Sequence, residues 1–159
     1  MSVATYANIE QSIRTRLLTF TPSSGSTLAV LLGSTTSGAG SSGKLYLDQP
    51  PDDVTGFYGV MRFVDLPVVG ADGGGMVKGI CEVILYGRPR SQGAAMKRMG
   101  SVVLEAWKDF SDTTAGSARC LYARDVTNAA LIPYTDPNDR ELLAWRALLP
   151  FMVTPSFLA

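Results

Sequence analysis

Apolar side chains recur every three or four residues in two segments of the chain, and this spacing predicts two amphipathic helices. The first segment covers residues 5–20, and its apolar stripe consists of Tyr6, Ile9, Ile13, Leu17 and Phe20. The second covers residues 91–110, and its wider stripe consists of Ala95, Met99, Val102, Val103, Ala106, Trp107 and Phe110. Pro22 would end the first helix, and Ser91 can cap the start of the second. Each helix therefore has one side that must pack against the rest of the protein.

Other segments show the alternation or the short apolar runs of β-strands. They are residues 44–48, 57–66, 76–88 and 140–153, and a further strand is expected within residues 119–134. Pro150 predicts an edge position or a bulge in the last segment, because proline cannot donate a hydrogen bond to a ladder. Residues 27–33 form a short apolar run that fits either one or two helical turns or a buried strand.

The order of these segments predicts an α+β fold. Consecutive strands joined by short turns would pair antiparallel, which gives a mostly antiparallel sheet of about four to five strands. The two amphipathic helices would pack on one face of that sheet. The 159 residues are expected to form a single domain, residues 1–159. Residues 33–43 contain only Gly, Ser, Thr and Ala, so this loop is expected to be mobile.

Charge and composition narrow the possible chemistry. Lys and Arg number 14 and so do Asp and Glu, and this balance argues against a basic nucleic-acid-binding surface and favours association with other chains. Histidine is absent, which excludes Ser-His and Cys-His nucleophile pairs and imidazole metal ligands. Cys81 and Cys120 are expected to be buried free thiols, with a disulfide or a reactive thiol as the alternatives. We therefore expect no catalytic residue, no cofactor and no metal.

The apolar runs are too short for a membrane span, which needs about 18 apolar residues. No basic region followed by an apolar region opens the chain, so no secretory signal is expected. These features predict a protein that has no contact with membranes and is made and kept in a cytosol.

Residues 38–44 read GAGSSGK, which matches the opening of a phosphate-binding loop. That motif requires a helix that begins at the lysine and a hydroxyl side chain that holds magnesium. Here Lys44 is followed by Leu45, and the next residues have the pattern of a strand. We interpret the match as part of a glycine- and serine-rich loop, and nucleotide binding remains the less favoured alternative.

Two other groups of charged residues have simple structural explanations. The carboxylates of Asp52, Asp53, Asp136 and Asp139 lie in predicted turns, where aspartate forms local hydrogen bonds. A basic group made of Arg88, Arg90, Lys97 and Arg98 fits a solvated strand end and helix face. Its alternative role is contact with an acidic partner surface or with DNA that passes nearby.

Taken in order, the segments resemble the tail terminator, or tail completion, proteins of long-tailed bacteriophages. After the N-terminal helix come the segments LAVLLG, KLYLDQPPDD and FYGVMRFVDLP. A long strand then carries EVILYGR, Glu82 to Arg88, directly into a helix, and the closing amphipathic strand is ELLAWRALLPFMV. The pattern covers most of the chain, and the Gly/Ser loop at 33–43 is longer than the family pattern.

The resemblance implies a structural protein of the virion and no enzyme. Copies would form a ring, usually of six, that caps the tail tube at its head-proximal end, stops its polymerisation and joins it to a head–tail connector or neck protein. A sheath protein would be a further partner in a contractile tail, DNA would only pass through the bore, and assembly would take place in the host cytoplasm. The alternative is another connector, neck or tail tube protein.

A ring of this kind needs two different contact surfaces on each copy. The segment 76–88 offers one, because Val77, Cys81, Val83 and Leu85 share a core face while more polar residues share the other. The candidate interface predicted from this second face and the strand end consists of Ile80, Glu82, Ile84, Tyr86, Arg88 and Arg90.

Overall fold

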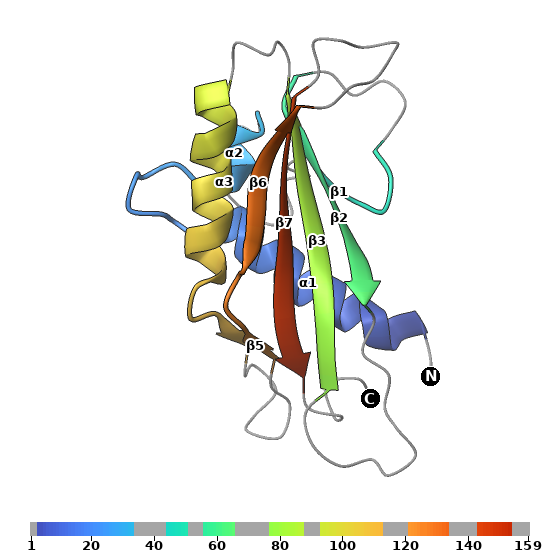
Figure 1. Cartoon of the computed structure of the whole chain (residues 1–159). Coiled ribbons are helices and arrows are strands. Elements are labelled where there is room, and N and C mark those ends of the chain that lie inside the picture. Colours follow the sequence, from blue (N-terminus) through green and yellow to red (C-terminus); the bar gives the residue numbers. More distant parts are fainter. Residues whose placement is uncertain are drawn as a thin grey trace.

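A computed structural model describes residues 3–33, 44–50, 56–65, 77–87, 93–112, 121–133 and 143–153. Within these ranges the chain forms three helices, which are α1 (Val3–Thr19), α2 (Leu28–Leu31) and α3 (Gly93–Trp107). Its strands are β1 (Leu45–Leu47), β2 (Tyr58–Asp65), β3 (Val77–Gly87), β4 (Ser111–Asp112), β5 (Leu121–Ala123), β6 (Asn128–Pro133) and β7 (Leu143–Val153). Figure 1 shows the helices on one side of a curled sheet.

The strands form one seven-stranded sheet in the order β1-β2-β3-β7-β5-β4, with β6 also paired to β7. The mixed helix and strand content and the mostly antiparallel pairing confirm the expected fold class. The expected count of four to five strands is wrong, because two strands instead of one lie within the described residues 121–133 and β4 is a further strand of two residues. So short a strand has no readable alternation.

The pairing of β1 with β2 also differs from the expectation, since it is parallel. Leu45 lies opposite Gly59 and Leu47 lies opposite Met61. Asp48 adopts a left-handed backbone conformation with φ 64°, which turns the chain out of β1. Parallel strands need a crossover connection, so β1 and β2 do not form a hairpin.

The core lies between the helices and the sheet face that is turned toward them. Most of the described residues of the two predicted apolar stripes are buried there, and Phe20 and Phe110 at the helix ends are partly buried against this core. Fully buried core residues include Ile9, Ile13 and Leu17 of α1, Val103 and Ala106 of α3, Cys81, Val83 and Leu85 of β3, and Ala147, Leu149, Phe151 and Val153 of β7. The side chains of β3 and β7 alternate between this face and the opposite one, as the period of two requires.

Two arginines of α1 fix this helix to its neighbours. Arg14 Nε donates a hydrogen bond to the backbone oxygen of Leu45 in β1 at 3.0 Å, and Arg16 Nε donates to the backbone oxygen of Ala106 at 2.7 Å. The Ala106 carbonyl belongs to the last turn of α3, where oxygens lack helical partners and a cation is favourable. Partial burial lowers the pKa of Arg16, and its guanidinium carbon lies 4.4 Å from the ring centre of Phe20.

The short apolar run at residues 27–33 forms helix α2 and not a strand. The Thr27 hydroxyl caps the helix by accepting a hydrogen bond from the backbone nitrogen of Val30 at 3.4 Å. Gly33 follows with φ 91°, a backbone conformation that favours glycine and ends the helix. Leu28 and Ala29 are fully buried, so this single turn adds to the core.

Helix α3 packs against Trp145 of β7 at Gly100. A β-carbon at this position would lie 2.3 Å from the indole of Trp145, a distance that no real contact allows. Trp145 is itself buried, so the absence of a side chain at Gly100 makes room for the indole. The packing of α3 on the sheet therefore depends on this glycine.

Pro150 lies in the interior of the sheet, between β3 on one side and β5 on the other, so the expectation of an edge position is wrong. The sheet accommodates it by an interruption in the neighbouring strand, because residues 124–127 separate β5 from β6. The Pro150 carbonyl accepts hydrogen bonds from the backbone nitrogen of Arg124 at 2.9 Å and from Trp107 Nε1 at 3.2 Å. The missing N–H of proline thus coincides with the break between two short strands.

Several sequence predictions concern residues outside the described ranges. They are the mobile loop from residue 34 onward, the cap at Ser91, the thiol of Cys120 and the aspartates Asp52, Asp53, Asp136 and Asp139.

Candidate interaction surface

The face of the sheet turned away from the helices carries the candidate interface (Figure 1). We call it the open face. Its residues in the three central strands are Tyr58, Val60 and Arg62 of β2, Lys78, Ile80, Glu82, Ile84 and Tyr86 of β3, and Ala144, Arg146, Leu148, Pro150 and Met152 of β7. Four of the six residues predicted for the interface therefore lie together on this face. The other two, Arg88 and Arg90, lie outside the described residues.

Glu82 lies at the centre of this face, and its side chain is buried. Only 1% of it is exposed, because two arginines enclose its carboxylate. Arg62 Nε lies 2.5 Å from Oε1, and Arg146 Nε donates a hydrogen bond to Oε2. The paired strands bring these groups together, since Arg62 is directly opposite Glu82 in β2 and Arg146 is diagonal to it in β7.

This Arg62–Glu82–Arg146 cluster combines two cations with one anion, so it carries one excess positive charge. Glu82 is the anion and is covered, whereas the cations reach the surface: the side chain of Arg62 is 57% exposed and that of Arg146 is 37% exposed. Both arginines contact Glu82 through Nε. A guanidinium has further N–H donors, so the cluster can offer positive charge and hydrogen-bond donors to a carboxylate of another molecule.

Two tyrosines extend the open face beside the cluster. Tyr58 and Tyr86 lie opposite each other on β2 and β3, and their rings stack with centroids 5.0 Å apart and planes inclined by 21°. Tyr86 is half-buried, as are Ile80 and Ile84 on the same strand. Stacked aromatic rings lose little conformational freedom when a partner covers them, which is why such residues are common in interfaces.

The sequence prediction missed the contributions of β2 and β7 to this face. Arg62 and Arg146 both interrupt strands that are otherwise rich in apolar residues. A cation in such a strand indicates a nearby carboxylate, since charged groups are seldom left unpaired inside a sheet. The two arginines therefore indicated an ion pair in the sequence, but the carboxylate that they share depends on the strand register.

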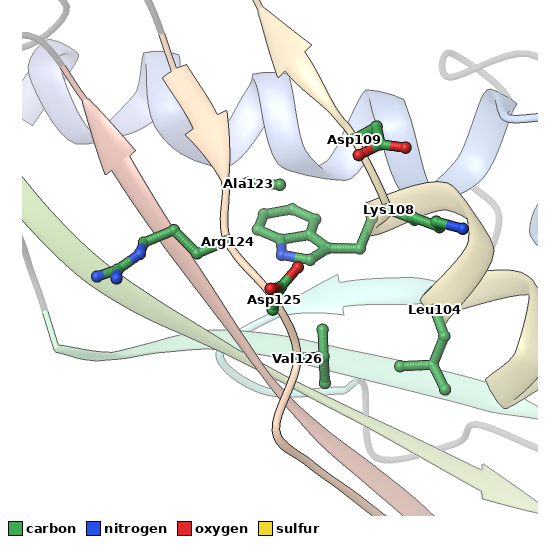
Figure 2. A pocket seen from close by; sticks show the side chains of 8 residues that line it. Leu104, Lys108, Asp109, Ala123, Arg124, Asp125 and Val126 are labelled. Carbon is green, nitrogen blue, oxygen red and sulfur yellow. The ribbon is translucent and has the colours of Figure 1, made fainter.

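A pocket of about 390 Å³ lies at the end of α3, beside the break between β5 and β6 (Figure 2). Its apolar lining comes from Leu104, Trp107, Ala123 and Val126, and its charged lining comes from Lys108, Asp109, Arg124 and Asp125. Helix α3 ends here, where Asp109 adopts a left-handed conformation with φ 57°. We call this region the α3–β5 pocket. The sequence could not predict it, because the pocket depends on the break opposite Pro150.

The charges of the α3–β5 pocket are unevenly placed. Figure 2 shows that the side chain of Arg124 points away from Leu104 and Lys108, on the far side of the strand. The side chains of Asp109, Asp125 and Lys108 lie around the apolar lining on the other side. The four charged lining residues are two cations and two anions, so their charges balance, and all four are exposed.

Cys81 is a buried free thiol, as expected. Burial raises its pKa well above the ordinary value, and the carboxylates of Glu82 and Glu10 raise it further. The thiolate is the nucleophilic form of cysteine, so this arrangement keeps Cys81 unreactive. Within the described ranges no group of three His, Cys, Asp or Glu side chains is placed to hold a metal ion.

The structure also bears on the phosphate-loop motif. Strand β1 begins directly after Lys44, as predicted, where a phosphate-binding loop would begin a helix. The glycines and serines of the motif lie outside the described residues.

The described helices include none that is both long enough and apolar enough to cross a membrane. Comparison with known proteins assigns no family, since no protein-family model matches the chain and no curated protein is detectably related to it.

Proposed function

We propose that the protein is a tail terminator of a long-tailed bacteriophage. Copies form a ring on the last ring of tail-tube subunits, stop further polymerisation and present a surface to the head–tail connector or neck protein. The mechanism is selective self-association and capping, and it breaks no covalent bond. The basis of the proposal is the order of segments in the sequence, to which the open face adds a physical reason for assembly.

The observation that carries the proposal is the combination of half-buried apolar residues, stacked tyrosines and an ion cluster on the open face. The two long helices pack on the other face, the arrangement that the resemblance implies, and so leave this one accessible. Ile80, Ile84, Leu148 and Pro150 remain partly exposed on this face, and apolar residues grouped at a surface can mark a contact with another protein. The apolar residues around the cluster favour a protein partner over nucleic acid, whose phosphates gain nothing beside isoleucine and leucine side chains.

The charge balance supports the same function. A ring that DNA crosses must not hold the DNA tightly, and a chain with equal numbers of acidic and basic residues meets that requirement. Partners would be other copies of the chain, the tube protein, the connector or neck protein, and a sheath protein if the tail contracts. The protein would act at the head-proximal end of the tail, after assembly in the host cytoplasm.

The first experiment measures the mass of the purified protein over a concentration series, with negative-stain images of the same samples. Closed rings with an open centre would support the proposal. A second assay adds the protein to growing tubes of its tube protein, where a halt in growth is the expected result. Tubes that lengthen normally would contradict the proposal, and binding to the connector without an effect on tube growth would indicate a neck or connector protein instead.

The role of the open face is tested by replacing Tyr86 and Arg88 with alanine. If this face is an interface, the double variant should remain folded and lose ring formation or capping. Val30→Ser is a matched control, since Val30 is an exposed apolar residue on α2, 43% exposed and on the helix side of the molecule. Unchanged rings and capping in the double variant would show that the open face is not the interface.

A further inference from the structure

We propose that the outer edge of β6 binds an extended segment of a partner protein, which adds one strand to the sheet. This inference rests on the proposed function, because it assigns the segment to another protein of the tail or neck and not to a second copy of the chain. It goes further by naming the contact surface and the chemistry of the contact, which is backbone hydrogen bonding between strands.

The pairing of the sheet shows which backbone groups of β6 point outward. The backbone nitrogen of Arg124 donates a hydrogen bond to the Pro150 carbonyl at 2.9 Å, so Pro150 and every second residue of β7 bond toward β5 and β6. In β6, Ala130 lies opposite one of these residues, and its neighbours along the strand point the other way. The N–H and C=O groups of Ala129 and Leu131 therefore point away from β7.

These outward groups are accessible. Among the described residues, no hydrogen bond ends at the outer groups of Ala129 or Leu131. Ala129 lies opposite the buried Ala147, on the side of the helices, and is nevertheless exposed. Helix α3 therefore leaves this part of β6 uncovered. Figure 1 shows β6 at a border of the sheet, where β7 is the described strand that pairs with it.

The opposite border of the sheet is closed by the chain itself. In β1 the Leu45 carbonyl accepts a hydrogen bond from Arg14 Nε at 3.0 Å, and the Leu47 carbonyl accepts one from the backbone nitrogen of Gln49 at 2.7 Å. Beyond β1 a register shift interrupts the edge of β2, and β4 has only two residues. Among the described strands, β6 is thus the longest edge that the chain leaves open.

The composition of β6 favours pairing with another strand. Its sequence, NAALIP, has no charged residue, whereas edge strands of natural proteins are often protected by lysine or other charges. Asn128, Ala129 and Ala130 are exposed and small, so another backbone can approach them closely. Pro133 ends the strand at a position whose N–H would point outward, so it leaves the bonds to β7 intact. We therefore expect an uncharged segment with small or apolar side chains.

A different protein fits this edge better than a second copy. Because the chain closes the β1 border, the described strands of two copies could pair only through β6 of each. Such a contact joins identical surfaces and stops at a dimer, which does not build a ring. We therefore assign the segment to a protein that the ring contacts, and pairing between copies is the alternative that the test must exclude.

Amide hydrogen exchange distinguishes the two edges of β6. In the free chain, measured by NMR, the outward amides of Ala129 and Leu131 should exchange at least about tenfold faster than the inward amides of Asn128 and Ala130. Mass spectrometry of residues 128–133 extends the measurement to assemblies. Exchange should stay fast in rings of the chain alone, and it should slow when the chain caps tubes or binds the neck protein.

A proline at the outward position tests the contact directly. Ala129→Pro removes the outward N–H and leaves the bonds of Ala130 to β7 in place. The variant should form rings like the wild type and bind tubes or the neck protein at least about tenfold more weakly. Ala129→Ser is the matched control, because serine keeps the N–H, and it should bind like the wild type. If circular dichroism shows that Ala129→Pro is unfolded, Ala129→Lys replaces it, since lysine on an edge opposes strand pairing.

Slow exchange of Ala129 and Leu131 in the free chain would overturn the inference, because the edge would already be covered. Slow exchange in rings of the chain alone would also overturn it, since a second copy would be the occupant. Fast exchange in capped tubes joined to the neck protein, or full binding by Ala129→Pro, would overturn the inference and leave the proposed function intact. Normal tube growth would contradict the proposed function, whereas slowed exchange on the neck protein alone would still support the inference.

Discussion

The two faces of the sheet use the same strands for different purposes. On the face toward the helices, β3 and β7 contribute Cys81, Val83, Leu149 and Phe151, and all four are fully buried. On the open face the same two strands contribute half-buried apolar residues around a buried carboxylate. The difference teaches that apolar content alone does not identify the core, since alternate residues of one strand can serve folding and assembly separately.

Glu82 is an exception to this division between the two faces, because it lies on the open face and its pairing is expected to affect the stability of the fold. Replacing Arg62 and Arg146 together with methionine would leave the carboxylate buried without a partner, and we expect the free energy of unfolding to fall by about 3–5 kcal/mol. Urea denaturation followed by tryptophan fluorescence would measure it. Arg62→Met alone should cost clearly less, because Arg146 still pairs with Glu82. Equal stability of the double variant and the wild type would show that the cluster contributes nothing to the fold.

The contrast between the faces is sharpest at Leu148 and Leu149, neighbours in β7 that point to opposite sides. Leu149 is fully buried on the core face, and Leu148 is half-buried on the open face. We expect Leu149→Ala to lower the free energy of unfolding by about 2–5 kcal/mol, because it leaves a cavity. Leu148→Ala should cost less than about 1 kcal/mol when the monomer is measured. Similar losses for both variants would mean that the open face is part of the core.

The close contact between α3 and the sheet gives a third prediction. Gly100→Ala should favour the helix by about 1 kcal/mol through backbone propensity, but the added methyl group would collide with Trp145. Overpacking of this kind costs about 1–3 kcal/mol, so a net loss of stability is expected in thermal unfolding. The matched control is Gly93→Ala in the same helix, where the nearest atom would be 3.9 Å from the new β-carbon. A control that loses as much stability as Gly100→Ala would count against steric contact as the cause.

The smallest effect is expected at the border of the core face, where Glu10 of α1 lies near Asp48. Burial raises the pKa of Glu10 above its ordinary value of 4.5, and the Asp48 carboxylate adds to the shift. A raised pKa means that the folded state favours the protonated acid, so this contribution to stability is present below about pH 4.5 and is lost as the pH rises through the folded value. Glu10→Gln should therefore be neutral at acid pH.

At pH 7 the same variant should gain up to about 0.5 kcal/mol, a size typical of surface positions. Unfolding midpoints at several pH values would measure the gain. A gain that is the same at pH 4 and pH 7 would exclude titration of Glu10 as its origin.

The sequence predicted those parts of the fold that depend on spacing within one segment. The apolar stripes of α1 and α3 and the two faces of β3 follow from helical and strand periods, and the structure confirms them. The order and pairing of strands from distant segments could not be predicted from the sequence. Two examples are the parallel pairing of β1 with β2 and the interior position of Pro150. Both depend on the order of the strands in the sheet, which the apolar pattern within one segment does not determine.

The candidate surface shows the same limit. The sequence placed Ile80, Glu82, Ile84 and Tyr86 on one face, which the strand period of two requires. It could not show that Glu82 is buried, because its partners Arg62 and Arg146 come from strands far away along the chain. A single charged residue in an otherwise apolar strand thus indicates an ion pair, but the strand register decides which residue of the neighbouring strand is its partner.

The place of β7 in the sheet has a consequence for synthesis. Among the described strands β7 comes last in the chain, yet it lies between β3 and the β5–β6 segments and pairs with all three. Until residue 153 has left the ribosome, the growing chain lacks the strand that joins the two halves of its sheet, and the core face of β3 has no neighbour on that side. Most of the native structure must therefore form after translation of β7, so a ribosome that stalls before this strand would hold a chain open to chaperones and proteases.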